Sequence, residues 1–356
     1  MSRISPMSLL PMVPVLALAL VVLAGPDRAV AAGNTRYWAL YHEDVQVPLS
    51  HQRCSELQLA GVLAPSQHLL CVNRPQVLRA VVRGLQRAVH YCQHTFRDSP
   101  WDCPLDAGSN RGYLFEQLQK SSTPESGYLR AAVASSIIYE IAADCRQGFI
   151  PNCPCGSVHK FIELLPNGTR IIGGCDVNIH HAATVAEPFL GAGLGAMATR
   201  EAVDHHNTEL GKLIGSSTEK YCRCHGLSAS CSIKVCHQKL SSFKTTHPEI
   251  LHTKYRQSQL VKSFQQGTLI STNQDAVTAE TMAHLDPSVN SCHMHSTVGK
   301  QCDSIVQCRQ TCCSSQYTER TVIVSMPICR LVMLGGVFRN TCVVTGTRMA
   351  TQYTCQ

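Results

Sequence analysis

Charged residues are scarce in this sequence. Only 15% of its 356 residues are Asp, Glu, Lys or Arg, and the formal net charge is +7 with 17 histidines. This weakly basic balance favours an anionic extracellular partner over nucleic acid, so we expect no nucleic-acid binding. Beyond its N-terminal stretch the chain also lacks an apolar run of the roughly 20 residues that a membrane span needs. It has no internal repeat at a fixed period.

The N-terminus has the pattern of a secretory signal peptide. Arg3 gives a weakly basic start, residues 9–24 are almost wholly apolar, and Ala-Val-Ala at 29–31 offers a small-x-small cleavage site. A membrane anchor is the alternative, but the run is short and contains two prolines. We expect a signal peptide at residues 1–31 and a protein secreted to the extracellular space and extracellular matrix.

Cysteine, in contrast, is abundant. The chain has 20 cysteines, and most of them lie in short-spaced pairs. In an oxidising compartment this pattern predicts a disulfide framework.

The pattern along the chain predicts a disulfide-rich α+β protein with two domains. Apolar periodicity predicts helices over 75–92, 123–145, 199–214 and 248–262, within a helical N-terminal domain at 32–262. Residues 263–287 are polar and weakly patterned, which indicates a linker. Residues 288–356 hold eight cysteines and β-branched runs, which predict a small cysteine-rich domain of strands and hairpins.

Three arginines repeat at a spacing of four residues in the first predicted helix. Arg79, Arg83 and Arg87 therefore share one helical face, which would suit a sulfated glycosaminoglycan such as heparan sulfate. The alternative is an ordinary solvated face, because the intervening apolar residues give the helix its buried side.

The most constrained segment is CRCHGLSASCSIKVC at residues 222–236, which we call the thumb hairpin. If Cys224 pairs with Cys231 and Cys222 with Cys236, the two disulfides nest and Ser228 lies at the exposed end. Closing a loop of about 15 residues stabilises a fold by roughly 3 kcal/mol in the chain-entropy model. Such a hairpin needs no core beneath it.

Three chemistries would explain a serine held in this position. A hydrolase nucleophile is disfavoured because GLSAS lacks the second glycine of the G-x-S-x-G elbow. A metal site is disfavoured because the thumb cysteines of a secreted chain are oxidised before they meet zinc, even with His225 and His237 beside them; His293 and His295 are a weak pair. We therefore expect no catalytic residue, metal or cofactor. Acylation of the hydroxyl fits the geometry best.

Five ordered motifs carry a specific resemblance over residues 54–356. The thumb hairpin resembles the C-K-C-H-G-x-S-G-S-C signature of the Wnt family of secreted signalling proteins. CQHTFRDSPWDC, ESGYLRAAVASSIIYEIAADC with GFIPNCPC, GGCDVN and HHNTELGK resemble further segments of that family.

The resemblance implies a fold, a modification and a set of partners. It implies a helical domain with a lipidated thumb and a cysteine-rich domain with a β-hairpin finger. A Porcupine-type O-acyltransferase would esterify a monounsaturated fatty acid to Ser228, and a lipid-carrying secretion factor would export the product. The acyl chain would bind the cysteine-rich domain of a Frizzled-type receptor, and a low-density-lipoprotein-receptor-related co-receptor is a further candidate. A secreted antagonist and, more remotely, a disulfide-rich hydrolase are the alternatives.

The resemblance also implies a pairing for every cysteine. The pairs outside the thumb are Cys92–Cys103, Cys145–Cys153, Cys155–Cys175, Cys292–Cys313, Cys302–Cys308, Cys312–Cys355 and Cys329–Cys342, with Cys54 and Cys71 left for each other. The even count closes with no free thiol.

This chain departs from the family pattern at the finger and around the thumb. ICRLVMLGGVFRNTC lacks four cysteines of the usual finger but keeps an apolar tip. We expect the tip, around a Gly-Gly turn, to contact the receptor through Val332, Met333, Leu334, Val337 and Phe338. Ala229 replaces a usual glycine beside the acylated serine, and His237 and Ile172 stand where tryptophans are common.

Asn167-Gly168-Thr169 is the one Asn-x-Ser/Thr sequon in the sequence. It lies in a turn-like stretch, so we expect N-glycosylation at Asn167.

Overall fold

The computed structural model describes residues 36–46, 49–104, 106–107, 110–111, 121–157, 162–191, 198–227, 230–288, 292, 297–314, 316–334 and 337–356. Its elements in chain order are η1 (Arg36–His42), α1 (His51–Leu59), α2 (Pro65–Asn73), α3 (Pro75–Thr95), β1 (Asp106–Ala107), β2 (Asn110–Arg111), α5 (Pro124–Gln147), β3 (Ile162–Leu164), β4 (Arg170–Gly173), α6 (Ile179–Leu190), α7 (Thr199–Gly215), β5 (Thr218–Cys224), β6 (Ile233–Leu240), α8 (Phe243–Arg256), β7 (Gln259–Gln265), β8 (Thr268–Ser271), β9 (Ala283–His284), β10 (Gln301–Cys302), α10 (Ile305–Thr311), β11 (Tyr317–Leu334) and β12 (Val337–Cys355). Within these ranges, no helix combines the length and the apolar character that a membrane crossing requires.

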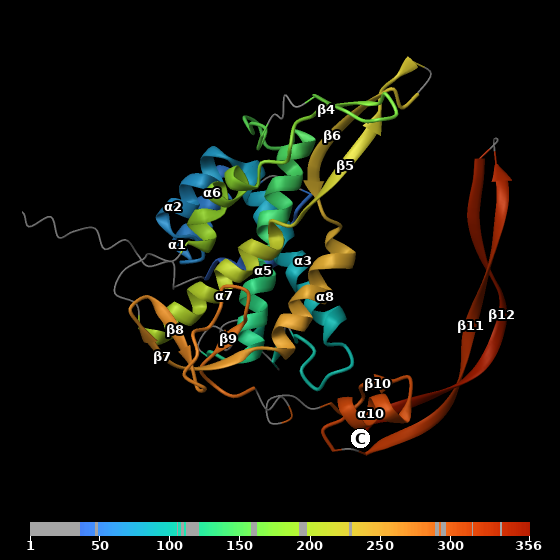
Figure 1. The fold of residues 1–356 in the computed structure, drawn as a ribbon. Helices are drawn as coiled ribbons and strands as arrows, with labels where there is room; N and C mark the ends of the chain where they lie inside the picture. The colour runs from blue at the N-terminus through green and yellow to red at the C-terminus, as the bar shows by residue number, and fades with distance from the viewer. Residues whose placement is uncertain are drawn as a thin grey trace, which may run out of the picture.

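Helix α5 is the centre of the helical domain, as Figure 1 shows. The Thr123 side chain caps its N-terminus by accepting from the Ser126 amide, and Gly148 ends it at φ 78°. Most side chains between these ends are buried, because the sequence supplies Ala, Ile and Val on all faces. Helices α3, α6, α7 and α8 pack around it and complete one core.

Two glycines let the neighbouring helices approach α5 closely. A Cβ added at Gly211 of α7 would lie 2.7 Å from the Cα of Ala131. A Cβ at Gly84 of α3 would lie 2.8 Å from the Cα of Ile137. Real Cβ atoms do not approach backbone this closely, so the tight packing of both helices on α5 requires glycine at these positions.

A four-stranded sheet with the order β3-β4-β6-β5 carries the thumb hairpin. Strands β5 and β6 are antiparallel, whereas β4 runs parallel to β6, from Arg170 opposite Ile233 to Gly173 opposite Cys236. In Figure 1 the β5–β6 hairpin projects beyond the helices.

The stretch 263–287, expected to be a linker, is folded. Strand β7 pairs with β8 in an antiparallel ladder and with β9 in parallel. Val261, Leu269 and Ala283 are buried against Ala202 and Val203 of α7. The prediction was wrong because the strands are short and their apolar residues are completed by a helix distant in sequence. The predicted helix over 248–262 likewise begins earlier, as α8, and gives way to β7 at Gln259.

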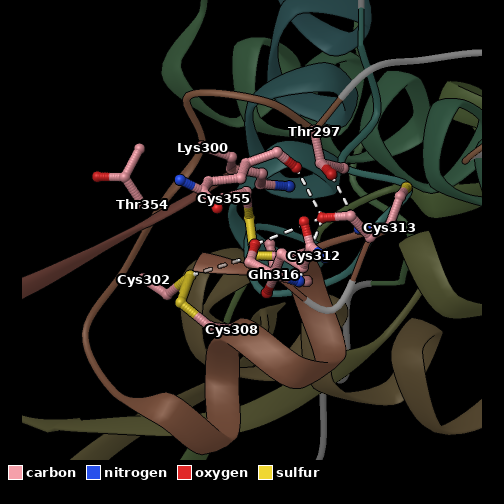
Figure 2. The surroundings of a disulfide bond; sticks show 12 residues. Thr297, Lys300, Cys302, Cys308, Cys312, Cys313, Gln316, Thr354 and Cys355 are labelled. Atoms are coloured by element: carbon pink, nitrogen blue, oxygen red, sulfur yellow. Dashed lines mark hydrogen bonds between the residues drawn. A yellow bond between two sulfur atoms is a disulfide. The ribbon is translucent and has the colours of Figure 1, made fainter. Parts of the chain in front are cut away.

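The C-terminal region combines a compact disulfide-linked base with a long ribbon. Strand β12 pairs with β10 at the base and with β11 along the ribbon. Figure 2 shows Cys302–Cys308 beside Cys312–Cys355, with the sulfurs of Cys302 and Cys312 3.9 Å apart. In the same view Thr297 Oγ1 accepts from the Cys313 amide at 2.9 Å.

The base contacts the helical domain through polar groups. Lys300 Nζ lies 3.0 Å from Asp102 Oδ2 and donates to the Ser99 carbonyl at 2.8 Å. Thr311 Oγ1 donates to the Asp98 carbonyl at 2.8 Å. These contacts connect α10 and the base to the loop that follows α3.

Candidate functional site: the thumb hairpin

Two disulfides close the thumb hairpin. Cys222 and Cys236 are directly opposite in the β5–β6 ladder and are bonded, with Cα atoms 4.1 Å apart. Cys224 and Cys231 form the inner disulfide, with Cα atoms 4.6 Å apart. The nested arrangement expected from the sequence is present in the structure.

Backbone hydrogen bonds order the loop beyond the inner disulfide. The His225 amide donates to the Ile233 carbonyl at 2.7 Å, and the Gly226 amide donates to the Ser230 carbonyl at 2.8 Å. A Cβ at Gly226 would lie 2.6 Å from that same carbonyl oxygen, so the close approach requires glycine. Leu227 is 94% exposed at the end of the hairpin. Ser228, the expected acylation site, and Ala229 lie outside the described residues.

The thumb disulfides bear directly on the metal alternative. All four thumb cysteines are bonded, so none of them offers a thiolate to a metal ion. His225 and His237 are both described, but His237 contacts Arg146 and carries no thiolate neighbour. His293 and His295 lie outside the described residues.

The disulfide framework follows the expected pairing where it is described. Nine pairs are present: Cys54–Cys71, Cys92–Cys103, Cys145–Cys153, Cys155–Cys175, Cys222–Cys236, Cys224–Cys231, Cys292–Cys313, Cys302–Cys308 and Cys312–Cys355. For Cys329 and Cys342 the structure gives the backbone register, in which the two residues are directly opposite. Their side chains lie outside the described set, and their bond stays a prediction.

The arginine face of α3 is turned toward α5, which corrects its interpretation as a glycosaminoglycan site. Arg83 Nε lies 2.9 Å from Glu140 Oε2, and its Nη2 contacts Asp144. Arg87 also pairs with Glu140. The Arg79 Nε is buried and has no hydrogen-bond partner among the described residues. The periodicity was recognised correctly, but buried carboxylates on α5 already neutralise Arg83 and Arg87.

The finger residues belong to the outer part of the β11–β12 ribbon. Met333 is opposite Phe338, and Leu334 is opposite Val337 in the last described register pair. Val332 is opposite Arg339. The backbone therefore forms the expected hairpin, while the side chains of these residues lie outside the described set and their receptor contact stays a prediction.

The sequon lies in an exposed turn between β3 and β4. Asn167 is exposed, and its Oδ1 accepts from the Thr169 amide at 3.1 Å. Gly168 adopts φ 81°, a conformation that glycine supplies without strain. The site is accessible for glycosylation, which remains a prediction.

Comparisons with known proteins identify the family. The family model described as "wnt family" matches residues 59–356. The chain is 32% identical to Protein Wnt-11b-2 of Xenopus tropicalis over 59% of this chain and 60% of that protein. It is 28% identical to Protein Wnt-8a of Danio rerio over 76% and 81%, respectively. It is 30% identical to Protein wingless of Drosophila melanogaster over 52% and 42%.

The fold and the cysteine framework thus define a disulfide-rich α+β protein of the Wnt type. The chain belongs to the Wnt family. The first matches span only about half of those relatives' own length, 42% of Protein wingless and 48% of Protein Wnt-1 of Ambystoma mexicanum. Among solved structures, a chain of human WLS in complex with WNT8A matches with a TM-score of 0.57 at 20% identity, over 80% of this chain and 95% of that chain. At that identity the likeness concerns the fold.

Proposed function

We propose that this chain is a secreted ligand of Frizzled-type receptors that acts in Wnt signalling through a monounsaturated fatty acyl group on Ser228. The observation that carries the proposal is the doubly disulfide-linked hairpin, whose last described residue before the serine, Leu227, is 94% exposed. A hydroxyl on such a hairpin is accessible to a Porcupine-type acyltransferase. The rigid hairpin would then present the lipid to a receptor.

The lipid would supply most of the binding free energy. A chain with about 14 buried methylenes at about 0.8 kcal/mol each contributes on the order of 10 kcal/mol before the loss of translational and rotational freedom. The exposed Leu227 beside it would add apolar contact area. A lipid of this size also needs a carrier in water, and the fold likeness to WNT8A in its complex with WLS supports a lipid-carrying secretion factor as partner.

The finger would make the second receptor contact. The antiparallel register brings Met333 opposite Phe338 and Leu334 opposite Val337, so apolar residues occur on both strands at the tip. A low-density-lipoprotein-receptor-related co-receptor is the further partner that we propose.

Replacement of the serine tests the proposal. We expect Ser228→Ala to be secreted and folded, to lack the acyl mass in intact-protein mass spectrometry, and to lose most affinity for the receptor's cysteine-rich domain. Ser230→Ala is the matched control, because Ser230 Oγ lies 3.0 Å from Ser232 Oγ on the same loop and we assign it no lipid. A Ser228→Ala protein that binds the receptor as tightly as the parent would refute the proposal.

The finger and the antagonist alternative need a separate readout. A Met333→Asp, Leu334→Asp double substitution should lower receptor affinity while secretion stays normal. If the parent protein binds the receptor through its lipid but does not activate it in a reporter cell, the chain is an antagonist rather than an agonist.

A further inference from the structure

A cleft of about 640 Å³ lies at the base of the thumb sheet, between its β5–β6 face and the C-terminal half of α5. Tyr221 and Arg223 come from β5, and His237 and Lys239 come from β6. The cross-strand register explains their common direction, because Tyr221 is opposite His237, and residues two apart on a strand point to the same face. Arg146 closes the cleft from α5.

The described residues that line this cleft include several cations and no carboxylate. Arg146, Arg223 and Lys239 are basic residues, and His225 and His237 add imidazoles. Tyr139, at the α5 side, contributes an aromatic wall. A wall of this composition is suited to an anion whose carbon body packs against the ring.

Only some of the cations that line the cleft have a carboxylate partner among the described residues. Lys239 Nζ pairs with Glu219 at 2.9 Å. Arg146 donates to the Cys175 carbonyl at 2.7 Å, which leaves its charge without a carboxylate among the described residues. Arg223 is exposed on β5 and forms no ion pair within the described part of the chain. Two guanidinium groups are therefore available to a ligand.

The contact between Arg146 and His237 also favours an anion in the cleft. Arg146 Nη2 lies 2.8 Å from His237 Nε2, so the guanidinium donates to a neutral imidazole. Desolvation, and then the charges of Arg146 and Lys239, lower the pKa of His237, while Asp176 acts in the opposite sense. Asp176 is itself buried and accepts from the Gln238 amide at 2.7 Å. An anion in the cleft would compensate the repulsion among these cations.

One polar side chain of the cleft, His237, distinguishes this chain from the family pattern. His237 and Ile172 occupy positions where the family pattern has tryptophans, and the indole of a tryptophan at 237 is a donor only, so it would offer Arg146 no acceptor nitrogen. The backbone next to His237 is tightly packed, since a Cβ at Gly174 would lie 3.2 Å from Val235 Cγ1 and 3.3 Å from His237 Cβ. The imidazole of His237 therefore places an acceptor nitrogen at the base of the thumb.

We propose that the cleft between β5, β6 and α5 binds a sulfate or phosphate ester, held by Arg146 and Arg223. Guanidinium groups recognise such oxyanions through paired, charge-assisted hydrogen bonds. The ester could be carried by a sulfated sugar or by an inositol phosphate, which share this chemistry. The site is separate from the exposed end of the thumb, so its occupation does not depend on acylation of Ser228.

Charge removal on the two faces of one strand tests the site. Arg223 faces the cleft, whereas Lys220 on the same strand lines the opposite face of the sheet with Glu163 and Gln238. Arg223→Ser and Lys220→Ser therefore change the net charge equally. The secreted full chain and both variants would be titrated by calorimetry with inorganic sulfate, inorganic phosphate, a fully sulfated heparin disaccharide and inositol hexakisphosphate.

We expect saturable binding of at least one organic ester, weakened about tenfold by Arg223→Ser, which corresponds to about 1.4 kcal/mol, and less than about twofold by Lys220→Ser. The tighter of the two organic esters identifies the source. Binding should strengthen as the pH falls toward the pKa of His237, and His237→Gln should abolish that dependence while the protein stays folded. Absence of saturable binding, or equal loss in the two serine variants, would overturn the proposal, since both indicate general charge attraction only.

Discussion

His247 of α8 should make the fold sensitive to acid. Its ring is completely buried, with Phe243 at 4.3 Å and Tyr139 at 5.5 Å between ring centroids. Neither ring nitrogen has a hydrogen-bond partner among the described residues. Burial, and then the nearby positive charge of Arg87, lower the pKa of His247 from 6.5 to about 4. Between pH 6.5 and about 4, the folded protein therefore holds a neutral imidazole where the unfolded chain holds a protonated one.

The sign and size of the effect follow from these two values. Between pH 6.5 and about 4 the unfolded chain binds the extra proton, so the free energy of unfolding falls as the pH falls through this window. A pKa difference of one unit corresponds to about 1.4 kcal/mol, so the full loss is about 3 kcal/mol. The stabilisation is fully present above the unfolded pKa, and about 2 kcal/mol of it is lost between pH 7 and pH 5.

Urea unfolding at pH 7 and pH 5, with the disulfides intact, measures this loss. Other groups titrate in the same range, so the informative quantity is the difference between the parent and His247→Leu, which keeps an apolar side chain in the site. The parent should lose about 2 kcal/mol more than this variant over that interval. His51→Leu, at an exposed position on α1, should behave as the parent does. Identical pH slopes for the parent and His247→Leu would show that this imidazole is not the sensor.

Two further substitutions test the packing of α5. Arg83→Met leaves two buried carboxylates on α5 with fewer partners and should lower the free energy of unfolding by about 3 kcal/mol, at the low end for a buried pair because the arginine is partly exposed. Arg97→Met removes an exposed ion pair and should change the free energy of unfolding by less than about 1 kcal/mol. Similar losses in the two variants would contradict the reasoning. Gly211→Ala forces a Cβ against the backbone of Ala131 and should destabilise the fold by about 1–3 kcal/mol in urea unfolding. Leu213→Ala, on the exposed side of α7, should not destabilise it. An unchanged unfolding midpoint for Gly211→Ala would mean that the two helices can separate freely.

Local sequence signals were enough to predict the helix at the centre of the fold and the doubly linked hairpin. Helix α5 has a capping threonine followed by proline, and its low charge indicates burial on all sides. The thumb disulfides could be predicted from spacing because the hairpin itself brings both pairs together: Cys222–Cys236 joins β5 to β6, and Cys224–Cys231 joins the end of β5 to the loop before β6. In each case the information lies within a few tens of residues.

The features that were missed depend on partners far away in the sequence. The arginines of α3 have the pattern of a surface face, but their carboxylate partner Glu140 lies 57 residues from Arg83 on another helix. Strand β7 pairs in parallel with β9, and its apolar residues are buried against α7. The cleft at the base of the thumb also combines α5 with β5 and β6. No local periodicity reports such contacts.

The β11–β12 ribbon explains why one more cross-strand bond matters in this chain. Among the described contacts, the ribbon packs against other elements at its base, through β10 and the disulfides Cys302–Cys308 and Cys312–Cys355. An isolated two-stranded hairpin is only marginally stable in water, so a long ribbon needs a second constraint beyond its base. Cys329 and Cys342 are directly opposite in the register, on the outer part of the ribbon. A bond between them would hold both strands together close to the apolar tip, which gives a physical reason why a finger that lacks four of the family's cysteines retains these two.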